Sequence, residues 1–293
     1  MTVSAPFAVV GFDGSEGSLP AMRWAVAHAD LFGPPRPVMV WRYPAALWGT
    51  TFAGGETIGV DVMQEGAEAA LAEALAEFGD IETAEPVVVQ GDPAVRLVKE
   101  AGGAGLLVVG SRGYGALRSR LLGSVGVYCV DHSTVPVVIV PHGAGRDEGF
   151  DGPRRVVVGI DGSDNADAAL RWALGHVRAD DEVVAVAAWH PTATLGYESI
   201  DAEAELLEQA ATEAVDEAVH RIAGELGVDA GRVRREHERG DPRTVLRRRA
   251  DDADLLVVGA RGRTGVSHLL VGSTASSLAH RPICPVAVVP LDR

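Results

Sequence analysis

Two sets of glycine residues have the spacing of a loop that binds phosphate through its backbone. Glycine lets a backbone take a positive φ or approach a ligand closely, and successive N–H groups in such a loop can surround an anion. The spacing, Gly-x2-Gly-x9-Gly-Ser, occurs at Gly110, Gly113, Gly123 and Ser124 and again at Gly259, Gly262, Gly272 and Ser273. The alternative is that these glycines serve only turns and a helix entry. The double occurrence favours two phosphate loops.

An aspartate follows the first apolar run of each half of the chain. Asp13 stands after Val-Val-Gly-Phe, and Asp161 stands after Val-Val-Gly-Ile. We expect these carboxylates to accept hydrogen bonds from a ribose or to help hold a divalent ion near phosphates. The alternative is that each aspartate helps to cap the next helix through the serine two positions later.

The cations that could reach a phosphate are arginines. Arg112 and Arg261 lie between the first two glycines of the two loops, although either could instead be solvated. The only lysine, Lys99, falls on an expected surface helix, and the sequence has no Gly-x4-Gly-Lys-Ser/Thr. A lysine-dependent phosphate loop is therefore excluded, and no Gly-x-Gly-x-x-Gly follows the first strand of either half.

Each half alternates apolar strand-like runs with helix-like segments, the order that gives a parallel sheet covered by helices on both faces. In the first half we predict strands at 7–11, 37–41, 86–90, 106–110 and 136–140 and helices at 16–31, 62–78, 93–101 and 124–133. In the second we predict strands at 155–160, 183–189, 232–237, 254–259 and 285–289 and helices at 164–177, 200–226, 242–250 and 273–280. Ligands bind at the carboxyl ends of such strands, where both aspartates and both loops fall.

A nearly constant offset relates the two halves, which indicates a duplicated domain. Asp13 returns 148 positions later as Asp161, whereas Gly110 returns 149 positions later as Gly259, so one residue has been inserted between them. We predict two tandem α/β domains, at 1–142 and 154–293, joined by a polar, glycine-rich linker at 143–153.

The composition, 47% hydrophobic and 23% charged, is that of a folded protein, and we expect a cytoplasmic location because no secretory signal or membrane-length apolar run is visible. The net charge of −15 opposes binding to nucleic acids and anionic membranes. The one dense basic run, 247–249, is expected on the solvent face of a helix, partly neutralised by Asp251 and Asp252. Cys129 and Cys284 are expected to be buried thiols rather than metal or redox groups.

The glycine motif after a buried fourth strand, with an aspartate after the first strand, resembles the ATP-binding branch of the universal stress protein family. The resemblance covers nearly the whole chain as two tandem domains. It implies a doubly wound domain with a five-stranded parallel sheet in the order 3-2-1-4-5, and one site per domain for ATP, with Mg2+. It also implies that the last strands, 136–140 and 285–289, pair between the domains, and an unpaired apolar edge there would invite such association.

The resemblance also assigns nucleotide contacts to particular residues. In the first domain they are Gly11, Asp13, Trp41, Val109, Gly110, Gly113, Gly123, Ser124 and Val125, and in the second they are Gly159, Asp161, Trp189, Val258, Gly259, Gly262, Gly272, Ser273 and Thr274. The two tryptophans stand where the family offers backbone groups to adenine. Because the copies differ after the serine, with Val-Gly in one and Thr-Ala in the other, their affinities need not be equal.

The expected function is that of a bacterial ATP-binding stress-response regulator, with weak or absent ATPase activity, whose nucleotide state alters its contacts with protein partners. No general base is evident, because His132 and His280 follow the loops at nonequivalent positions. An enzyme of the same nucleotide-binding group, acting by adenylation or as an ATPase, and an interaction protein with vestigial sites are the alternatives. Association into a homodimer stays open, as does the identity of any metal.

Overall fold

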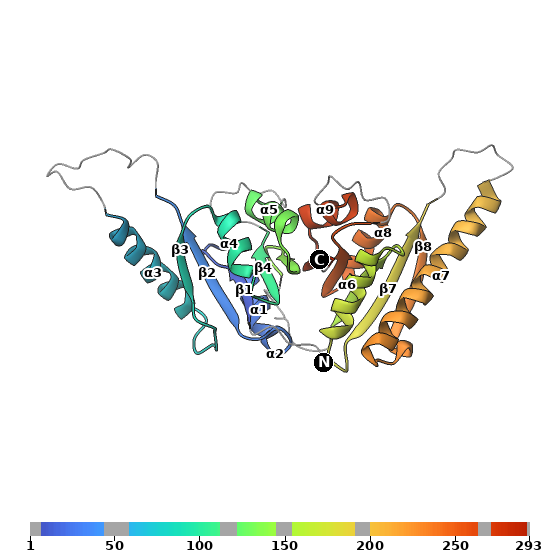
Figure 1. Ribbon diagram of the computed structural model, residues 1–293, viewed down its shortest axis with the longest axis horizontal. Coiled ribbons are helices and arrows are strands. Elements are labelled where there is room, and N and C mark those ends of the chain that lie inside the picture. Colours follow the sequence, from blue (N-terminus) through green and yellow to red (C-terminus); the bar gives the residue numbers. More distant parts are fainter. Residues whose placement is uncertain are drawn as a thin grey trace.

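The chain folds around one ten-stranded sheet with helices on both faces (Figure 1). The computed structural model describes residues 7–43, 59–111, 122–144, 154–190, 200–262 and 271–291. The strand order is β3-β2-β1-β4-β5-β10-β9-β6-β7-β8, so each half has the order 3-2-1-4-5. Neighbouring strands within each half are parallel. The predicted fold class is therefore confirmed.

The elements lie close to their predicted positions. In the first half the strands are β1 Ala8–Gly11, β2 Pro35–Trp41, β3 Val87–Gln90, β4 Leu106–Gly110 and β5 Val137–Val140, and the helices are α1 Leu19–Ala27, α2 Ala29–Phe32, α3 Val60–Ala76, α4 Pro93–Ala101 and α5 Ser124–His132. In the second half the strands are β6 Arg155–Ile160, β7 Glu182–Trp189, β8 Val233–Arg239, β9 Leu255–Gly259 and β10 Val286–Val289, and the helices are α6 Asp164–Gly175, α7 Ile200–Leu226, α8 Pro242–Arg249 and α9 Ser273–His280. None of the helices in the described residues is both long and apolar enough to cross a membrane.

The first predicted helix, 16–31, is divided into two. α1 ends at Ala27 and α2 begins at Ala29, and His28 between them has φ −116° and ψ 17°. The imidazole Nδ1 of His28 lies 2.7 Å from the carbonyl oxygen of Trp24, the acceptor that the backbone N–H of His28 would use in a continuous helix. This contact accompanies the turn between the two helices.

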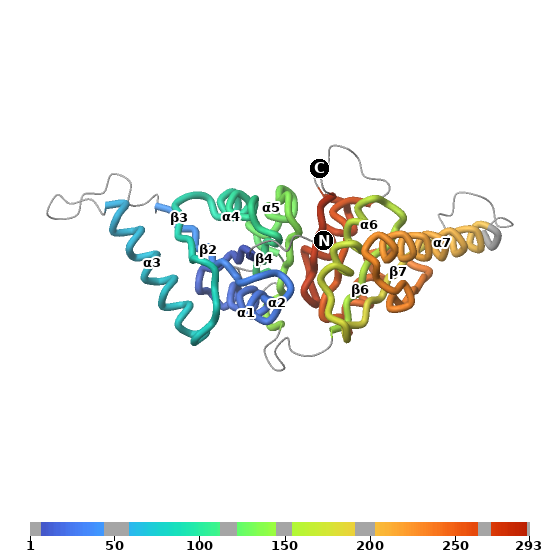
Figure 2. The backbone as a smooth tube through the Cα atoms, turned by 60° about the horizontal axis from the view of Figure 1, so that its bottom comes forward, coloured from blue at the N-terminus to red at the C-terminus, as the bar shows by residue number. Residues whose placement is uncertain are grey.

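Alternate residues of the central strands enter two separate apolar cores. Val10 and Val108 pack on the face covered by α1, α3, α6 and α7, whereas Val9 and Leu107 pack on the face covered by α4, α5, α8 and α9. All four side chains are fully buried, which explains why these strands read as continuous apolar runs. The longest helices, α3 and α7, lie at opposite ends of the molecule (Figure 2).

The two halves are joined edge to edge through their last strands. β5 and β10 pair antiparallel, with Val137 opposite Val288, Val138 opposite Ala287, and Ile139 opposite Val286. Each of these residues is almost completely buried. The predicted pairing of the last strands is confirmed, and it covers two apolar edges that would otherwise be exposed.

A stack of aromatic rings forms a second contact between the halves. The ring centroids of Trp24 and His28 are 4.2 Å apart. The ring centroid of Phe32 lies 4.9 Å from that of His176 and 5.5 Å from that of Trp172. The Trp-His pairs occupy equivalent positions at the ends of α1 and α6, at the offset of 148, and each histidine is the C-cap residue of its helix. Phe32 thus bridges two copies of one local structure and adds apolar contact beyond the sheet.

The basic run at the end of α8 has different partners from those predicted. Arg248 forms an ion pair with Glu238 of β8, and Arg249 lies 2.8 Å from a carboxylate oxygen of Glu236 on the same strand. Asp252, an expected partner, instead lies 3.7 Å from Arg155. These partners belong to the strand directly before α8, and the sequence does not show which of the carboxylates before and after this helix the arginines reach.

Both cysteines are buried free thiols, as predicted. Cys129 lies in α5, and Cys284 lies just before β10. Burial raises the pKa of each thiol to about 12. Since the thiolate is the reactive form, neither side chain is suited to redox or metal chemistry at neutral pH.

The buried histidine of the aromatic stack predicts acid sensitivity. Burial lowers the pKa of His28 from 6.5 to about 4. The hydrogen bond to the Trp24 carbonyl and, less strongly, Asp30 oppose this shift, whereas Arg154 and Arg178 reinforce it. The unfolded chain therefore binds a proton more readily, so the stability contribution is full above pH 6.5 and is lost as the pH falls toward 4. We expect a loss of up to about 3 kcal/mol across this window.

The measurement is urea unfolding between pH 7 and pH 4.5. His28→Gln should flatten the pH dependence of the unfolding free energy, whatever its effect at pH 7. His220→Gln, which changes an exposed histidine on α7, is the control and should leave the slope as in the wild type. Equal slopes for His28→Gln and the wild type would contradict the assignment.

Candidate functional site

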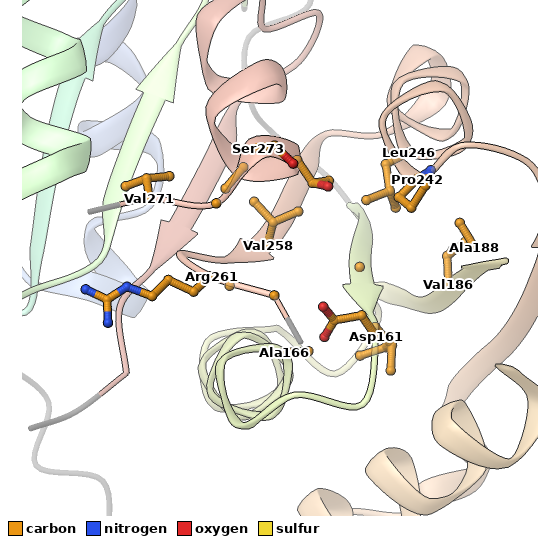
Figure 3. Close-up of a pocket in the computed structure, with 17 residues that line it drawn as sticks. Asp161, Ala166, Val186, Ala188, Pro242, Leu246, Val258, Arg261, Val271 and Ser273 are labelled. Carbon is orange, nitrogen blue, oxygen red and sulfur yellow. The ribbon is translucent and has the colours of Figure 1, made fainter. Parts of the chain in front are cut away.

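Nine predicted site residues meet in one pocket of the second half (Figure 3). The pocket has a volume of about 540 Å³ and lies where β6, β7 and β9 end and where α8 and α9 begin. These residues are Gly159, Asp161, Val258, Gly259, Arg261, Gly262, Gly272, Ser273 and Thr274. The position between β6 and β9 is the point at which the strand order reverses, as expected for a ligand site in this type of sheet.

Asp161 directs its carboxylate into the pocket (Figure 3). Its Oδ1 accepts hydrogen bonds from the N–H of Ser163 at 3.0 Å and from the hydroxyl of Ser163 at 2.6 Å. The Ser163 hydroxyl also accepts from the N–H of Ala166 at 3.2 Å and so caps α6. The capping role therefore belongs to the serine, and Asp161 fixes that serine while still lining the pocket.

Two glycines of the same motif are required for different reasons. A Cβ at Gly259 would lie 2.5 Å from the backbone oxygen of Asn165, so this glycine allows α6 to approach β9. A Cβ at Gly262 would lie 2.7 Å from Oδ2 of Asp161, so this glycine keeps the loop close to the carboxylate. The first residue serves packing, and the second shapes the pocket.

α9 begins at the pocket without a side-chain cap. Its N-cap residue is Gly272, with φ −71° and ψ 157°, and the N–H of Gly272 donates to the carbonyl of Ala260 at 2.7 Å. Ser273 is the first helical residue rather than the N-cap, and its side chain lines the pocket beside Thr274. The first N–H groups of a helix and its dipole attract an anion, so this end of the pocket suits a phosphate.

The opposite part of the pocket is apolar. It is lined by Val186 and Ala188 of β7, by Pro242 and Leu246 of α8, and by Val258 of β9 (Figure 3). These groups can enclose a flat ring but offer it no side-chain hydrogen bond. Sequence reasoning missed all of them except Val258, although the Gly-Asp-Pro that begins α8 repeats the one before α4 and could have marked this wall.

Neither tryptophan expected at the base appears in the described pocket lining. Trp189 does not line the pocket, and its carbonyl accepts a hydrogen bond at 2.8 Å from the N–H that follows β8. Ala188, one residue earlier, lines the pocket instead. In the first half, the indole N–H of Trp41 donates to Gln64 of α3 at 2.7 Å. Side chains alternate between the faces of a strand, so a difference of one residue moves the side chain to the other face.

The described part of the first site repeats this geometry. Oδ1 of Asp13 accepts hydrogen bonds from the N–H of Ser15 at 3.1 Å and from its hydroxyl at 2.6 Å. α5 starts at an uncapped Gly123, whose N–H donates to the carbonyl of Ser111 at 3.1 Å. The aspartate turn and the glycine entry to the helix are thus the same in both halves.

The remaining residues of the first site can be placed only in part. A Cβ at Gly11 would lie 3.4 Å from Val109, the distance also found between Gly159 and Val258 in the second half. Gly110 ends β4, and Ser124 and Val125 begin α5. Arg112 and Gly113 lie outside the described residues.

One hydrogen bond connects the second half to the phosphate loop of the first. The N–H of Leu122, directly before Gly123, donates to the carbonyl of His280 at 2.9 Å. His280 is the last residue of α9, whose other end forms part of the second pocket. A single short helix therefore reaches both sites.

The second pocket has few polar side chains in its described lining. Its described lining includes one carboxylate, one guanidinium and two hydroxyls, from Asp161, Arg261, Ser273 and Thr274. His280 is not among the lining residues, and its Nδ1 lies 2.8 Å from the carbonyl of Ser276 within α9. Among the described residues no three histidine, cysteine or carboxylate side chains are grouped as a metal site.

Comparison with known proteins agrees with this architecture. The Universal stress protein family matches residues 8–141 and 152–290. A universal stress protein of Mycolicibacterium smegmatis is 31% identical over 290 residues, which cover 96% of each chain. A universal stress protein of Mycobacterium tuberculosis is 30% identical over 297 residues, which cover 96% of this chain and 95% of the relative. A universal stress protein structure from Archaeoglobus fulgidus covers 98% of each chain, with a TM-score of 0.65 and 22% identity, and supports the fold.

The fold and the site define a tandem α/β protein whose second half-sheet has a pocket at its switch point. The double family match and the relatives along nearly the full length make the assignment specific. The chain belongs to the universal stress protein family.

The close approach of α6 to Gly259 predicts a loss of stability when this glycine is replaced. Gly259→Ala should lower the free energy of unfolding by about 2 kcal/mol, because the new methyl group would overlap backbone atoms of α6 that cannot move independently. Gly175→Ala, at the end of α6, would meet no atom within 4 Å and is the matched control. Chemical denaturation of both variants measures the difference, and equal stabilities would refute the packing role.

Proposed function

We propose that this protein binds ATP at one site in each domain. The observation that carries the proposal is the combination, in one pocket, of an uncapped helix start, a carboxylate and an apolar wall. The triphosphate would lie at Gly272 and Ser273, the ribose near Asp161, and the adenine against Ala188 and Leu246. This division of polar and apolar surface matches the division within a nucleotide.

A divalent ion would be held mainly by the bound nucleotide. Asp161 is the carboxylate in the described lining of the second pocket, and Mg2+ normally combines one or two carboxylates with phosphate oxygens and water. The residues therefore fit an ion that arrives with ATP. They would orient it without forming a separate all-protein site.

The same pocket supports a regulatory role with weak or absent ATPase activity. Efficient phosphoryl transfer needs a positioned nucleophile and a cation at the transition state, and the described lining has no histidine, glutamate or lysine to activate water. We propose a cytoplasmic stress-response protein with domains 1–142 and 154–293. Its nucleotide state would alter contacts with protein partners or with a second copy.

The first test of the proposal is the nucleotide content of the purified protein. We expect protein denatured directly after purification to release ATP, up to two molecules per chain, identified by chromatography and mass spectrometry. If the protein is isolated empty, added ATP should bind in equilibrium titration. Absence of both would reject the function, and release of mainly ADP would reopen the question of ATPase activity.

The second test uses the pocket glycine. Gly262→Val should weaken ATP binding at the second site by at least tenfold, because even a Cβ would lie 2.7 Å from Oδ2 of Asp161. Gly224→Ala, in α7, meets no atom within 4 Å and should bind as the wild type does. Calorimetry should show one of two sites lost in Gly262→Val. Two unchanged sites would place the nucleotide elsewhere.

A further inference from the structure

His142 contacts both loops that form the first site. It lies two residues after the end of β5. Its imidazole Nδ1 is 3.2 Å from the backbone oxygen of Glu16, and its backbone N–H donates to the hydroxyl of Ser111 at 3.2 Å. A carbonyl can only accept, so Nδ1 carries the proton in this contact.

The first of these loops, residues 12–18, is the aspartate loop. Besides the two bonds from Ser15 to Asp13, the Ser18 hydroxyl donates to the carbonyl of Ser15 at 3.0 Å and accepts from the N–H of Asp13 at 3.4 Å. Glu16 lies within this hydrogen-bonded turn. A bond to the Glu16 carbonyl therefore acts on the whole turn, including the carboxylate of Asp13.

The second loop is the phosphate loop, which leaves β4 at Ser111. Ser111 is buried, and its N–H donates to the carbonyl of Val140 at 2.9 Å. Its carbonyl accepts from the N–H of Gly123, the residue that starts α5. Through Ser111, the backbone of His142 is thus connected to the helix start at which a phosphate would bind.

The second domain does not have the residues for this connection. At the offset of 149, His142 corresponds to Leu291 and Ser111 corresponds to Ala260, so neither the ring donor nor the hydroxyl is present. The backbone hydrogen bond between Ser111 and Val140 has a counterpart, since the N–H of Ala260 donates to the carbonyl of Val289 at 2.8 Å. At these positions the second domain lacks the side chains that join the two loops.

We propose that His142 is a positioning residue of the first site, holding the aspartate loop and the phosphate loop at a fixed separation. The proposal rests on ATP binding as the function of that site. A ligand that contacts both loops binds more tightly when their separation is fixed in advance, because less conformational entropy is lost. The first site is therefore the more strongly organised of the two.

The experiment measures each site alone in the full-length chain. Asp161→Ala silences the second site, so that ATP titration reports the first, and Asp13→Ala does the reverse. In the Asp161→Ala background, His142→Leu should weaken ATP binding by about threefold to tenfold, the effect of losing one hydrogen bond. His142→Asn should restore most of the affinity, because Nδ2 of asparagine can donate from nearly the place of the imidazole Nδ1.

The controls separate positioning from a general loss of structure. Leu291→Ala, at the equivalent position, should leave the first site unchanged, and His142→Leu should leave the second site unchanged in the Asp13→Ala background. Equal ATP affinity at the first site, with and without His142→Leu in the Asp161→Ala background, would overturn the proposal. So would an equal loss in His142→Asn and His142→Leu, or an equal loss at both sites.

Hydrogen exchange of the chain without added ligand tests the connection independently of ATP. His142→Leu should speed exchange of the amides of the aspartate loop and of Gly123, whereas His142→Asn should not. If the wild type binds no ATP, the proposed function fails, and the positioning role at a nucleotide site fails with it. Unchanged exchange in His142→Leu, in a chain that does bind ATP, would reject the positioning role alone.

Discussion

The antiparallel pairing of β5 with β10 is the constraint on which the rest of the structure depends. Parallel half-sheets of this kind end in a buried apolar strand, and either strand left alone would expose a row of unpaired backbone groups. Pairing them makes one continuous sheet and fixes the position of each half. The aromatic stack around Phe32 and the hydrogen bond from Leu122 to His280 both form only because this pairing has brought the halves together.

Most of the fold could be predicted because its signals are local or repeated. The run at 106–110 is apolar at four successive positions, and its copy at 255–259 is identical, so a buried strand was the simple interpretation. The division at His28 was not foreseen, since no glycine or proline stands at 27–29 to mark it. The partners of Arg248 and Arg249 were missed because carboxylates both precede and follow α8 in the sequence, and spacing alone does not show which of them the arginines reach.

The site was predictable in its polar half and not in its apolar half. Glycine and aspartate have a distinctive spacing, whereas Val186, Ala188 and Leu246 have the composition of any core. The glycine motif also combines unlike requirements, since Gly259 accommodates a helix and Gly262 accommodates a carboxylate. A motif of this kind identifies the loop, but the role of each glycine follows only from the atoms around it.

Covalent fusion of the two halves changes how the sites can diverge. In a symmetric homodimer every substitution appears twice, so a histidine gained beside one site is gained beside the other as well. Here the same pseudo-symmetric sheet is built from one polypeptide, and each position mutates singly. His142 is therefore present in one half, whereas the equivalent position of the other half is Leu291. The tandem chain has the architecture of a dimer with the evolutionary freedom of a heterodimer, and its subunits can never be produced in unequal amounts or paired with the wrong copy.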